Sequence, residues 1–454
     1  MNLSIKEENI HQLYLGLIVL ALVFMFLPIH IQFIGEESVY AVYLQNMLQT
    51  GDYINAFYRP PLFLWISSGL ETLFNFHSIE LPLRIASILS SLCAAFFAGF
   101  FAHKVFQKKD AGIIGTLLFL TLGEIQFWYG WLGYADAMFL FFIFSSTVCL
   151  WLAAQFRKIH WYALAVILIN LAFLTKSLTA YAFFFSTLFI VSYGFKSWIF
   201  FLRPINILLS IGIIIAPLFW TTMHGSGAAS TSSSLIHDIA MRFTSIDIPH
   251  YLKHLAMFPI EFVARMAPIS FVLIYFIIKQ KPSLDSNIIR MIGAIFIINY
   301  LPYWLAPFSN MRHVVPLYAW GSLALTYFLL QYDFKVQRAA IIAITIVLLL
   351  KVPFSLWGLP FLKEKDASQD FKPAAIDILK QVSNDAIIRQ SSVSFVGFAL
   401  TAYINEIQSS KENIHFLNSN DHHVYIIAHD PLKGSIIIKT YTLFGGITYL
   451  LYLE

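Results

Sequence analysis

The chain has 454 residues, of which 58% are hydrophobic and 12% charged, with a formal net charge of +4. Runs of about twenty apolar residues recur from Leu13 to Trp357, each long enough to cross a bilayer core of roughly 30 Å, so the composition indicates a polytopic helical membrane protein rather than a set of soluble domains. Basic residues cluster in the short loops between these runs and form no continuous basic face, so the composition does not indicate a nucleic-acid-binding protein.

The first apolar run follows the charged residues 6–8, and no small-residue cleavage site follows Pro28. We interpret this run as a retained anchor and not as a removed signal. Cys93 and Cys149 both lie inside apolar runs, where a thiol usually contributes to packing. The sequence therefore predicts no disulfide framework.

The apolar runs predict an all-α bundle of eleven membrane spans, followed by a small C-terminal domain. The spans cover residues 12–29, 83–103, 111–123, 137–156, 161–174, 178–195, 203–220, 258–279, 289–308, 313–331 and 338–357. With the N-terminus inside, the loops satisfy the positive-inside rule. The cytoplasmic side then holds Lys104, Lys108, Lys109, Arg157, Lys158, Lys196, Arg203, Lys279, Lys281, Arg290, Lys335 and Arg338, and the opposite side holds Arg59, Lys176, Arg242, Lys253 and Arg312.

Two long loops are predicted on the extracytoplasmic side. Residues 30–82 form the first, and apolar residues at helical spacing between positions 39 and 47 predict a helix lying at the membrane interface. Residues 221–257 form the second, whose GSGAASTSSS stretch is typical of a mobile lid. A short segment rich in aromatic residues, 124–135, is typical of an interfacial belt.

The composition changes after Trp357, where charged helical stretches and short β-rich runs such as VYIIAHD and GSIIIKTYTLF appear. These patterns predict a small α/β or α+β domain. We therefore expect a transmembrane domain over residues 1–360 and a C-terminal domain over residues 361–454. The odd number of spans places the C-terminal domain outside the cytoplasm.

Two adjacent carboxylates, Glu36 and Glu37, follow the first span. They either cap a helix, since its dipole favours negative charge at the N-terminus, or supply a general base whose pKa is set by burial and by its neighbour. Later in the same loop, Arg59 precedes two prolines. Its side chain is either an interfacial anchor or a phosphate ligand.

Further charged residues follow on the same predicted side. Asp136 begins the fourth span, as a helix cap or as a second acid, and Lys176 lies in FLTKS, as a solvated turn residue or as a point charge for a lipid-linked phosphate. Arg312 and His313 precede the tenth span as an anchor or a phosphate contact. A site of His and Glu for a divalent metal stays open, but no HExxH motif or paired His spacing indicates one, and no cofactor is predicted with certainty.

The predicted topology thus brings three acids and three bases to one membrane face. A transporter or a lipid-linked-sugar flippase is the alternative function, and an inactive scaffold with a binding ectodomain is a further one. A carrier is expected to place ionisable residues near the middle of its spans and to show two related halves. The sequence displays no such repeat.

The order of these residues resembles the C-type glycosyltransferases, the family that includes protein O-mannosyltransferases and bacterial lipid A aminoarabinose transferases. Its members typically carry Asp-Glu, Tyr-Ala, Met-Leu-x-x-Gly-Asp, Lys-Pro-Pro-Leu, Pro-Asp-Ala and Phe-Leu-Thr-Lys-Gly in this order. The matching residues are Glu36-Glu37, Tyr40-Ala41, Met47-Leu48-Gln49-Thr50-Gly51-Asp52, Arg59-Pro60-Pro61-Leu62, Ala135-Asp136-Ala137 and Phe173-Leu174-Thr175-Lys176-Ser177, and Arg312 with Pro316 resembles a late pattern of the family. Two departures are Glu36 in place of Asp and Arg59 in place of Lys.

The resemblance implies an integral-membrane enzyme that transfers a hexose or pentose from a polyprenyl-phosphate donor, with inversion, to an extracytoplasmic acceptor. It implies catalytic roles for Glu36, Glu37 and Asp136. It also implies donor-phosphate contacts from Arg59, Lys176 and Arg312, and substrate contacts from Tyr40, Tyr58 and His313. We expect a bacterial inner-membrane protein with its active site on the periplasmic side and no nucleic-acid partner. Lipid A, another envelope glycan and a protein stay open as acceptors.

Overall fold

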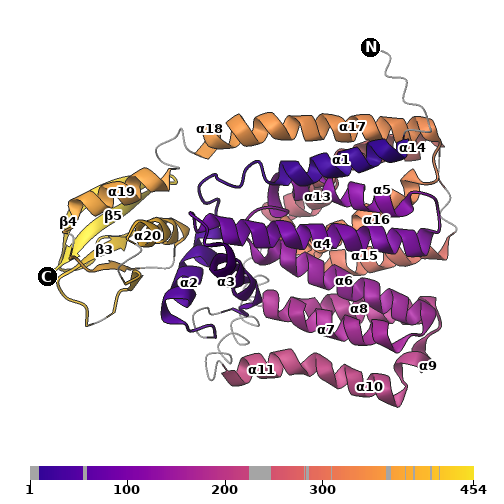
Figure 1. The fold of residues 1–454 in the computed structure, drawn as a ribbon, viewed down its shortest axis with the longest axis horizontal. Coiled ribbons are helices and arrows are strands. Elements are labelled where there is room, and N and C mark those ends of the chain that lie inside the picture. Colours follow the sequence, from indigo (N-terminus) through magenta and orange to yellow (C-terminus); the bar gives the residue numbers. More distant parts are fainter. Residues whose placement is uncertain are drawn as a thin grey trace, which may run out of the picture.

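The computed structural model of the protein describes residues 10–54, 59–223, 247–280, 282, 286–307, 309–363, 370–383, 385–391, 394–408, 412–418 and 420–454. A helical bundle forms most of the molecule, and a small domain with a β-sheet lies at one end of it (Figure 1). The predicted fold class, a polytopic helical bundle with a small C-terminal sheet domain, is confirmed.

The bundle is built from helices of very different length. In chain order they are α1 (Ile10–Met25), α4 (Glu80–Phe106), α5 (Ala111–Leu120), the π-helix η2 (Ile125–Tyr129), α6 (Ala135–Phe156), α7 (Ile159–Thr175), α8 (Thr179–Gly194), α9 (Trp198–Phe201), α10 (Pro204–Ile211), η3 (Gly212–Ile214), α11 (Ile215–Met223), α13 (Ile248–Arg265), α14 (Ile269–Gln280), α15 (Asn287–Leu305), η4 (Met311–Val314), α16 (Leu317–Leu329), α17 (Phe334–Pro353), the π-helix η5 (Phe354–Gly358) and α18 (Leu359–Lys363).

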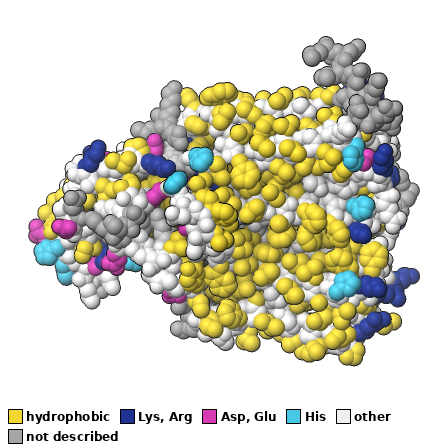
Figure 2. Space-filling view, in the orientation of Figure 1, with side chains coloured by type: hydrophobic (Ala, Val, Ile, Leu, Met, Phe, Trp, Pro, Cys, Tyr) yellow, Lys and Arg dark blue, Asp and Glu magenta, His cyan; other side chains and the backbone are white. Residues whose placement is uncertain are grey.

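Within the described residues, five helical stretches are long and apolar enough to span a membrane by themselves. These stretches are Glu80–Phe106, Ala135–Phe156, Pro204–Met223, Asn287–Leu305 and Phe334–Lys363. Several other apolar helices of the bundle are shorter. The number of eleven spans therefore stays a prediction. In the view of Figure 2, hydrophobic side chains cover the bundle, as expected of a protein that faces lipid, and Lys and Arg gather at the end of the bundle opposite the C-terminal domain.

Helix α6 lies at the centre of the bundle and packs against α4, α7, α8 and α16. Nearly all of its residues are buried, with small polar side chains such as Ser145, Ser146 and Thr147 among them. A helix that is apolar on every side is covered either by lipid or by other helices, and the burial of α6 shows that other helices cover it here. Its first turn is also buried, so Asp136 lies inside the protein.

The predicted span over residues 258–279 is broken near its middle. Helices α13 and α14 meet at an angle of 105°. Pro268 stands at the break, and a proline lacks the backbone N–H that would continue the helix. The carbonyl of Ala267 accepts a hydrogen bond of 2.8 Å from the N–H of Gly123, so the bend is held by the loop before η2.

The segment predicted as the first extracytoplasmic loop contains two helices, α2 (Glu37–Thr50) and α3 (Leu62–Phe74). Helix α2 ends at Gly51, whose φ of 70° is a left-handed conformation that glycine adopts without a Cβ clash. The apolar face predicted for this segment is buried at Val42 and Met47. Its polar face, however, contacts the C-terminal domain: Gln45 donates to the carbonyl of Ala402 at 2.9 Å.

The C-terminal domain consists of α19 (Phe371–Gln381) and α20 (Phe395–Ile407) with a five-stranded sheet in the order β2-β1-β3-β5-β4. The strands are β1 (Ile388–Gln390), β2 (His415–Phe416), β3 (Val424–Ala428), β4 (Ser435–Leu443) and β5 (Gly446–Leu453). Strand β1 is parallel to β2 and β3, whereas β5 is antiparallel to β3 and β4. Phe444 and Gly445, both with positive φ, connect β4 to β5 in a tight hairpin.

The C-terminal domain is joined to the bundle by buried polar contacts. Tyr403 of α20 donates a hydrogen bond of 2.9 Å to Glu80 at the start of α4 and accepts one of 2.9 Å from the N–H of Phe33. Glu80 and Tyr403 are both buried. Because an unpartnered buried polar group costs about 1–3 kcal/mol, these contacts fix the domain against the end of the bundle.

Candidate active site

The site centres on Asp136 in the first turn of α6. The positive end of the helix dipole favours a carboxylate at this position. The side chain is only 1% exposed, yet it forms ion pairs with Lys176 and, at 2.9 Å, with Nε of Arg312. Two cations from segments far apart in the chain therefore compensate the cost of burying this charge.

Lys176 directly follows α7, and its ammonium donates to Asp136. The ammonium also lies 5.6 Å from the centre of the Phe139 ring. Burial lowers the pKa of Lys176, and the charge of Arg312 acts in the same direction, whereas Asp136 opposes both. Lys176 is thus held as a cation mainly by its carboxylate partner.

Arg312 lies in the short helix η4 and connects two carboxylates. Its Nε binds Asp136 at 2.9 Å, its Nη1 binds Glu36 at 2.6 Å, and its guanidinium stacks 4.7 Å from the centre of the Tyr134 ring. Burial disfavours its charge, but Asp136 and Glu36 raise the pKa of Arg312 above its ordinary value. The planar, forked guanidinium suits this bridging position better than an ammonium would.

The two adjacent glutamates point into different environments. Glu37 is 1% exposed and accepts hydrogen bonds from Arg84 at 2.9 and 2.6 Å and from the backbone N–H groups of Ile34 and Gly133 at 2.8 and 2.6 Å. Glu36 is 52% exposed and is bound by Arg312. Glu37 thus joins the loop before α2, the start of α4 and the loop before α6, while Glu36 faces outward.

The other predicted site residues take several positions. Tyr40 is buried with its ring edge-on to Phe63, and burial is the main cause that raises its pKa to about 12. The charge of Arg59 is close enough to Tyr40 and Lys176 to act on both. His313 accepts from the N–H of Asn310 at 3.2 Å in the cap of η4.

Tyr58 lies outside the residues that the structure describes, as do residues 224–246 of the predicted lid. Within the described ranges, no group of three or more His, Cys, Asp or Glu side chains is placed to hold a metal ion.

Sequence reasoning missed two residues that shape the site, Arg84 and Tyr134. Arg84 is fully buried and binds Glu37, and its position inside an apolar run is a signal of a paired or functional charge. The hydroxyl of Tyr134 donates to the carbonyl of Ile34 at 2.8 Å and accepts from the N–H of Glu36 at 2.9 Å. Nothing distinguishes Tyr134 from the other aromatic residues of its segment in the sequence.

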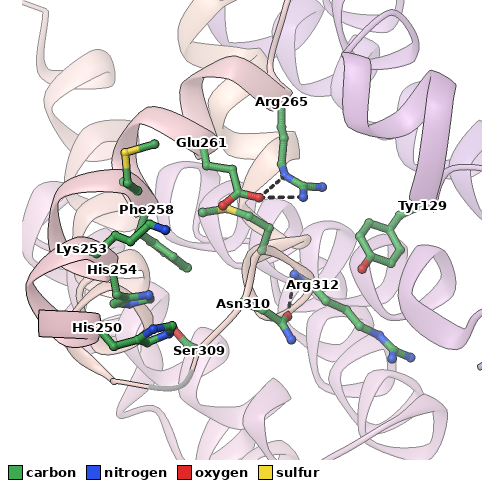
Figure 3. A pocket seen from close by; sticks show the side chains of 12 residues that line it. Tyr129, His250, Lys253, His254, Phe258, Glu261, Arg265, Ser309, Asn310 and Arg312 are labelled. Carbon is green, nitrogen blue, oxygen red and sulfur yellow. Dashed lines mark hydrogen bonds and ion pairs between the residues drawn. The ribbon is translucent and has the colours of Figure 1, made fainter. Parts of the chain in front are cut away.

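A cavity of about 270 Å³ adjoins Arg312 (Figure 3). Most of its wall comes from α13, and the rest comes from η2 and from the segment that leads into η4. The lining residues are Tyr129, His250, Lys253, His254, Met257, Phe258, Glu261, Arg265, Ser309, Asn310, Met311 and Arg312.

Comparisons with known proteins relate the chain to one family of membrane enzymes. Residues 58–220 match the family described as dolichyl-phosphate-mannose-protein mannosyltransferase. The chain is 24% identical over 220 residues to the undecaprenyl phosphate-alpha-4-amino-4-deoxy-L-arabinose arabinosyl transferase of Wigglesworthia glossinidia brevipalpis, an alignment that covers 45% of this chain and only 37% of that relative.

Two crystal structures of ArnT from Cupriavidus metallidurans have the same fold. The structure bound to undecaprenyl phosphate superposes with a TM-score of 0.71 at 13% identity, covering 96% of this chain and 97% of that one. The apo structure gives a TM-score of 0.69 at 12% identity, with the same coverage of both chains. The predicted resemblance to C-type glycosyltransferases that use polyprenyl-phosphate sugars is confirmed.

Proposed function

We propose that this chain is an integral-membrane glycosyltransferase that moves a sugar from a polyprenyl-phosphate donor to an acceptor on the extracytoplasmic side. The observation that carries the proposal is the ion-pair chain from Lys176 through Asp136 and Arg312 to Glu36, which draws on four distant segments. A similar protein carries the name of an undecaprenyl-phosphate-sugar transferase, and a similar fold binds undecaprenyl phosphate.

In the proposed reaction, an acceptor hydroxyl or amine attacks the anomeric carbon of the donor sugar. The new bond forms on the face opposite the phosphate, the bond from the anomeric carbon to the phosphate oxygen breaks, and polyprenyl phosphate leaves with the electron pair. Lys176, Arg312 and Arg59 stabilise the charge that develops on the departing phosphate. Cations already in place at such a charge lower the barrier without further reorganisation.

We assign the general base to Glu36, which takes the proton of the acceptor. Its carboxylate is half exposed and is bound by Arg312. Asp136 is buried and bound by two cations, so its role is to orient Lys176 and Arg312. Glu37 accepts four hydrogen bonds inside the fold, so we place it in a structural role.

We further propose that the site and the C-terminal domain face the periplasm of a bacterial inner membrane. The support is the gathering of Lys and Arg at the opposite end of the bundle, because positively charged loops stay in the cytoplasm (Figure 2). Lipid A, another envelope glycan or a protein is the acceptor, and the sugar is a pentose or a hexose.

The test uses purified protein in liposomes with a polyprenyl-phosphate sugar donor, with release of polyprenyl phosphate as the readout. Glu36→Gln should lower kcat by about 100-fold or more, since a general base typically contributes 10²–10⁴-fold. Arg59→Ala should also lower the rate. Glu412→Gln, an exposed residue of the C-terminal domain, is the matched control and should leave the rate unchanged. Full activity in both Glu36→Gln and Arg59→Ala would refute the proposal.

A further inference from the structure

Lys351 is a basic residue in the last turn of the apolar helix α17, and its side chain is completely buried. Its amino group donates a hydrogen bond of 2.6 Å to the carbonyl of Gln126, and no described carboxylate forms an ion pair with it. Burying an ammonium without a counter-charge costs free energy, and a Met of similar length would avoid that cost. An ionisable residue in such a place inside a membrane protein indicates a functional role.

The carbonyl that Lys351 binds belongs to the π-helix η2. A π-helix is wider than an α-helix and occurs mostly as a single turn, often near a functional site. The amino group also lies 5.4 Å from the ring centre of Phe127, which packs edge-on against Phe354 of the second π-helix, η5. In addition, the amide of Gln126 donates to the carbonyl of Ala21 in α1, which lies beside α17 (Figure 1). Two helices far apart in the chain thus fix η2.

The loop after η2 carries two residues of the candidate active site. The hydroxyl of Tyr134 accepts from the N–H of Glu36, and the ring of Tyr134 stacks on Arg312. Asp136 follows at the start of α6 and binds Lys176 and Arg312. Because only a short loop separates η2 from these residues, a shift of η2 would move both contacts with Arg312.

Trp131 is a second point at which Lys351 contacts this loop. The centre of the indole ring lies 5.1 Å from the amino group of Lys351 and 5.5 Å from the guanidinium of Arg84. Cations are attracted to the face of an indole ring. The indole N–H has no hydrogen-bond partner among the described residues, so the ring contacts hold this side chain. Ser91 of α4 fixes the neighbouring carbonyl of Gly130 by a hydrogen bond of 2.9 Å.

We propose that Lys351 is a positioning residue of the transfer reaction, which fixes η2 and Trp131 so that Tyr134 and Asp136 hold Arg312 in place. The inference rests on the proposed function and adds a residue that touches neither donor nor acceptor. Support of the fold does not explain Lys351, because a charge buried without a counter-charge lowers stability. Placement matters for the rate, since a displacement of about 1 Å can lower it roughly 100-fold.

The test compares Lys351→Met, which removes the charge and keeps the length of the side chain, with the wild type. Lys335→Met is the matched control, because Lys335 is an exposed lysine at the start of the same helix. Three quantities are measured on the full chain in lipid nanodiscs. They are the thermal denaturation midpoint, the hydrogen exchange of peptides that cover residues 125–136, and the release of polyprenyl phosphate from a polyprenyl-phosphate sugar.

Lys351→Met should melt at the temperature of the wild type or above it. Its hydrogen exchange over residues 125–136 should be at least tenfold faster, and kcat should fall about 10–100-fold with little change in KM. Lys335→Met should match the wild type in all three measurements. When Lys351→Met is combined with Arg312→Lys, the loss in kcat should be smaller than the product of the two single losses, because both act through the same guanidinium.

A lower melting midpoint with kcat unchanged per folded molecule would overturn the inference, because Lys351 would then only support the fold. Unchanged exchange over residues 125–136, or losses that multiply in the combined variant, would overturn it too. A wild-type protein that releases no polyprenyl phosphate would count against the proposed function instead. Hydrogen exchange needs no turnover, so it still decides whether Lys351 holds this segment.

Discussion

Replacing Glu37 with Gln separates a structural carboxylate from a catalytic one. The substitution keeps the shape of the side chain but removes its charge from a pair with Arg84, in which both side chains are almost completely buried. Breaking a buried ion pair typically costs about 3–5 kcal/mol, because the remaining charge has no partner. The Gln amide also has only one acceptor oxygen for the N–H groups of Ile34 and Gly133.

We therefore expect Glu37→Gln to lower the thermal denaturation midpoint of the detergent-solubilised protein clearly, with activity lost in proportion to the folded fraction. Glu36→Gln is the matched variant at the neighbouring position. It should keep the midpoint and lose turnover, because Glu36 is half exposed. A Glu37→Gln protein that melts like the wild type but turns over no donor would refute this reasoning and return Glu37 to the catalytic residues.

Two further predictions concern charge. Arg312→Lys should lower kcat by about 10–100-fold with the fold intact. The shorter, single-headed ammonium cannot reproduce the separate bonds of the guanidinium to Asp136 and Glu36, and each charged hydrogen bond is worth about 1.5–3 kcal/mol. Turnover equal to that of the wild type would contradict this prediction. Burial, followed by the nearby charge of Glu80, raises the pKa of Glu406 in α20 to about 7, well above the value of about 4.3 for an unfolded chain. The native state then binds the proton more strongly, so stability falls as pH rises from about 4.3 to 7. Glu406→Gln should melt like the wild type at pH 4 and at a higher temperature than the wild type at pH 8; a difference that is the same at both pH values would refute the assignment.

The predicted convergence of charges on one face came from loop charge and motif order, and the structure brings Glu36, Asp136, Lys176 and Arg312 into one ion-pair chain. The sequence did not predict which residue each buried polar or charged side chain binds. Arg84 binds Glu37 across 47 positions, and Gln45 meets Ala402 across 357. Periodicity reveals which face of a helix is apolar, but it carries no information on which distant face will cover it.

The sequence by itself determined the class of protein, because a helix satisfies its backbone hydrogen bonds within one segment in lipid, and continuous runs of about twenty apolar residues therefore specify helices. It also determined that a small sheet domain follows the bundle. Only the tertiary structure decided that Glu36 is half exposed while Glu37 is buried, and that α13 and α14 meet at a bend of 105°. Both outcomes depend on long-range contacts, with Arg84 and with the loop at Gly123. Pro268 marks a break in the helix, but no local pattern in the chain encodes the partners or the angle of the bend.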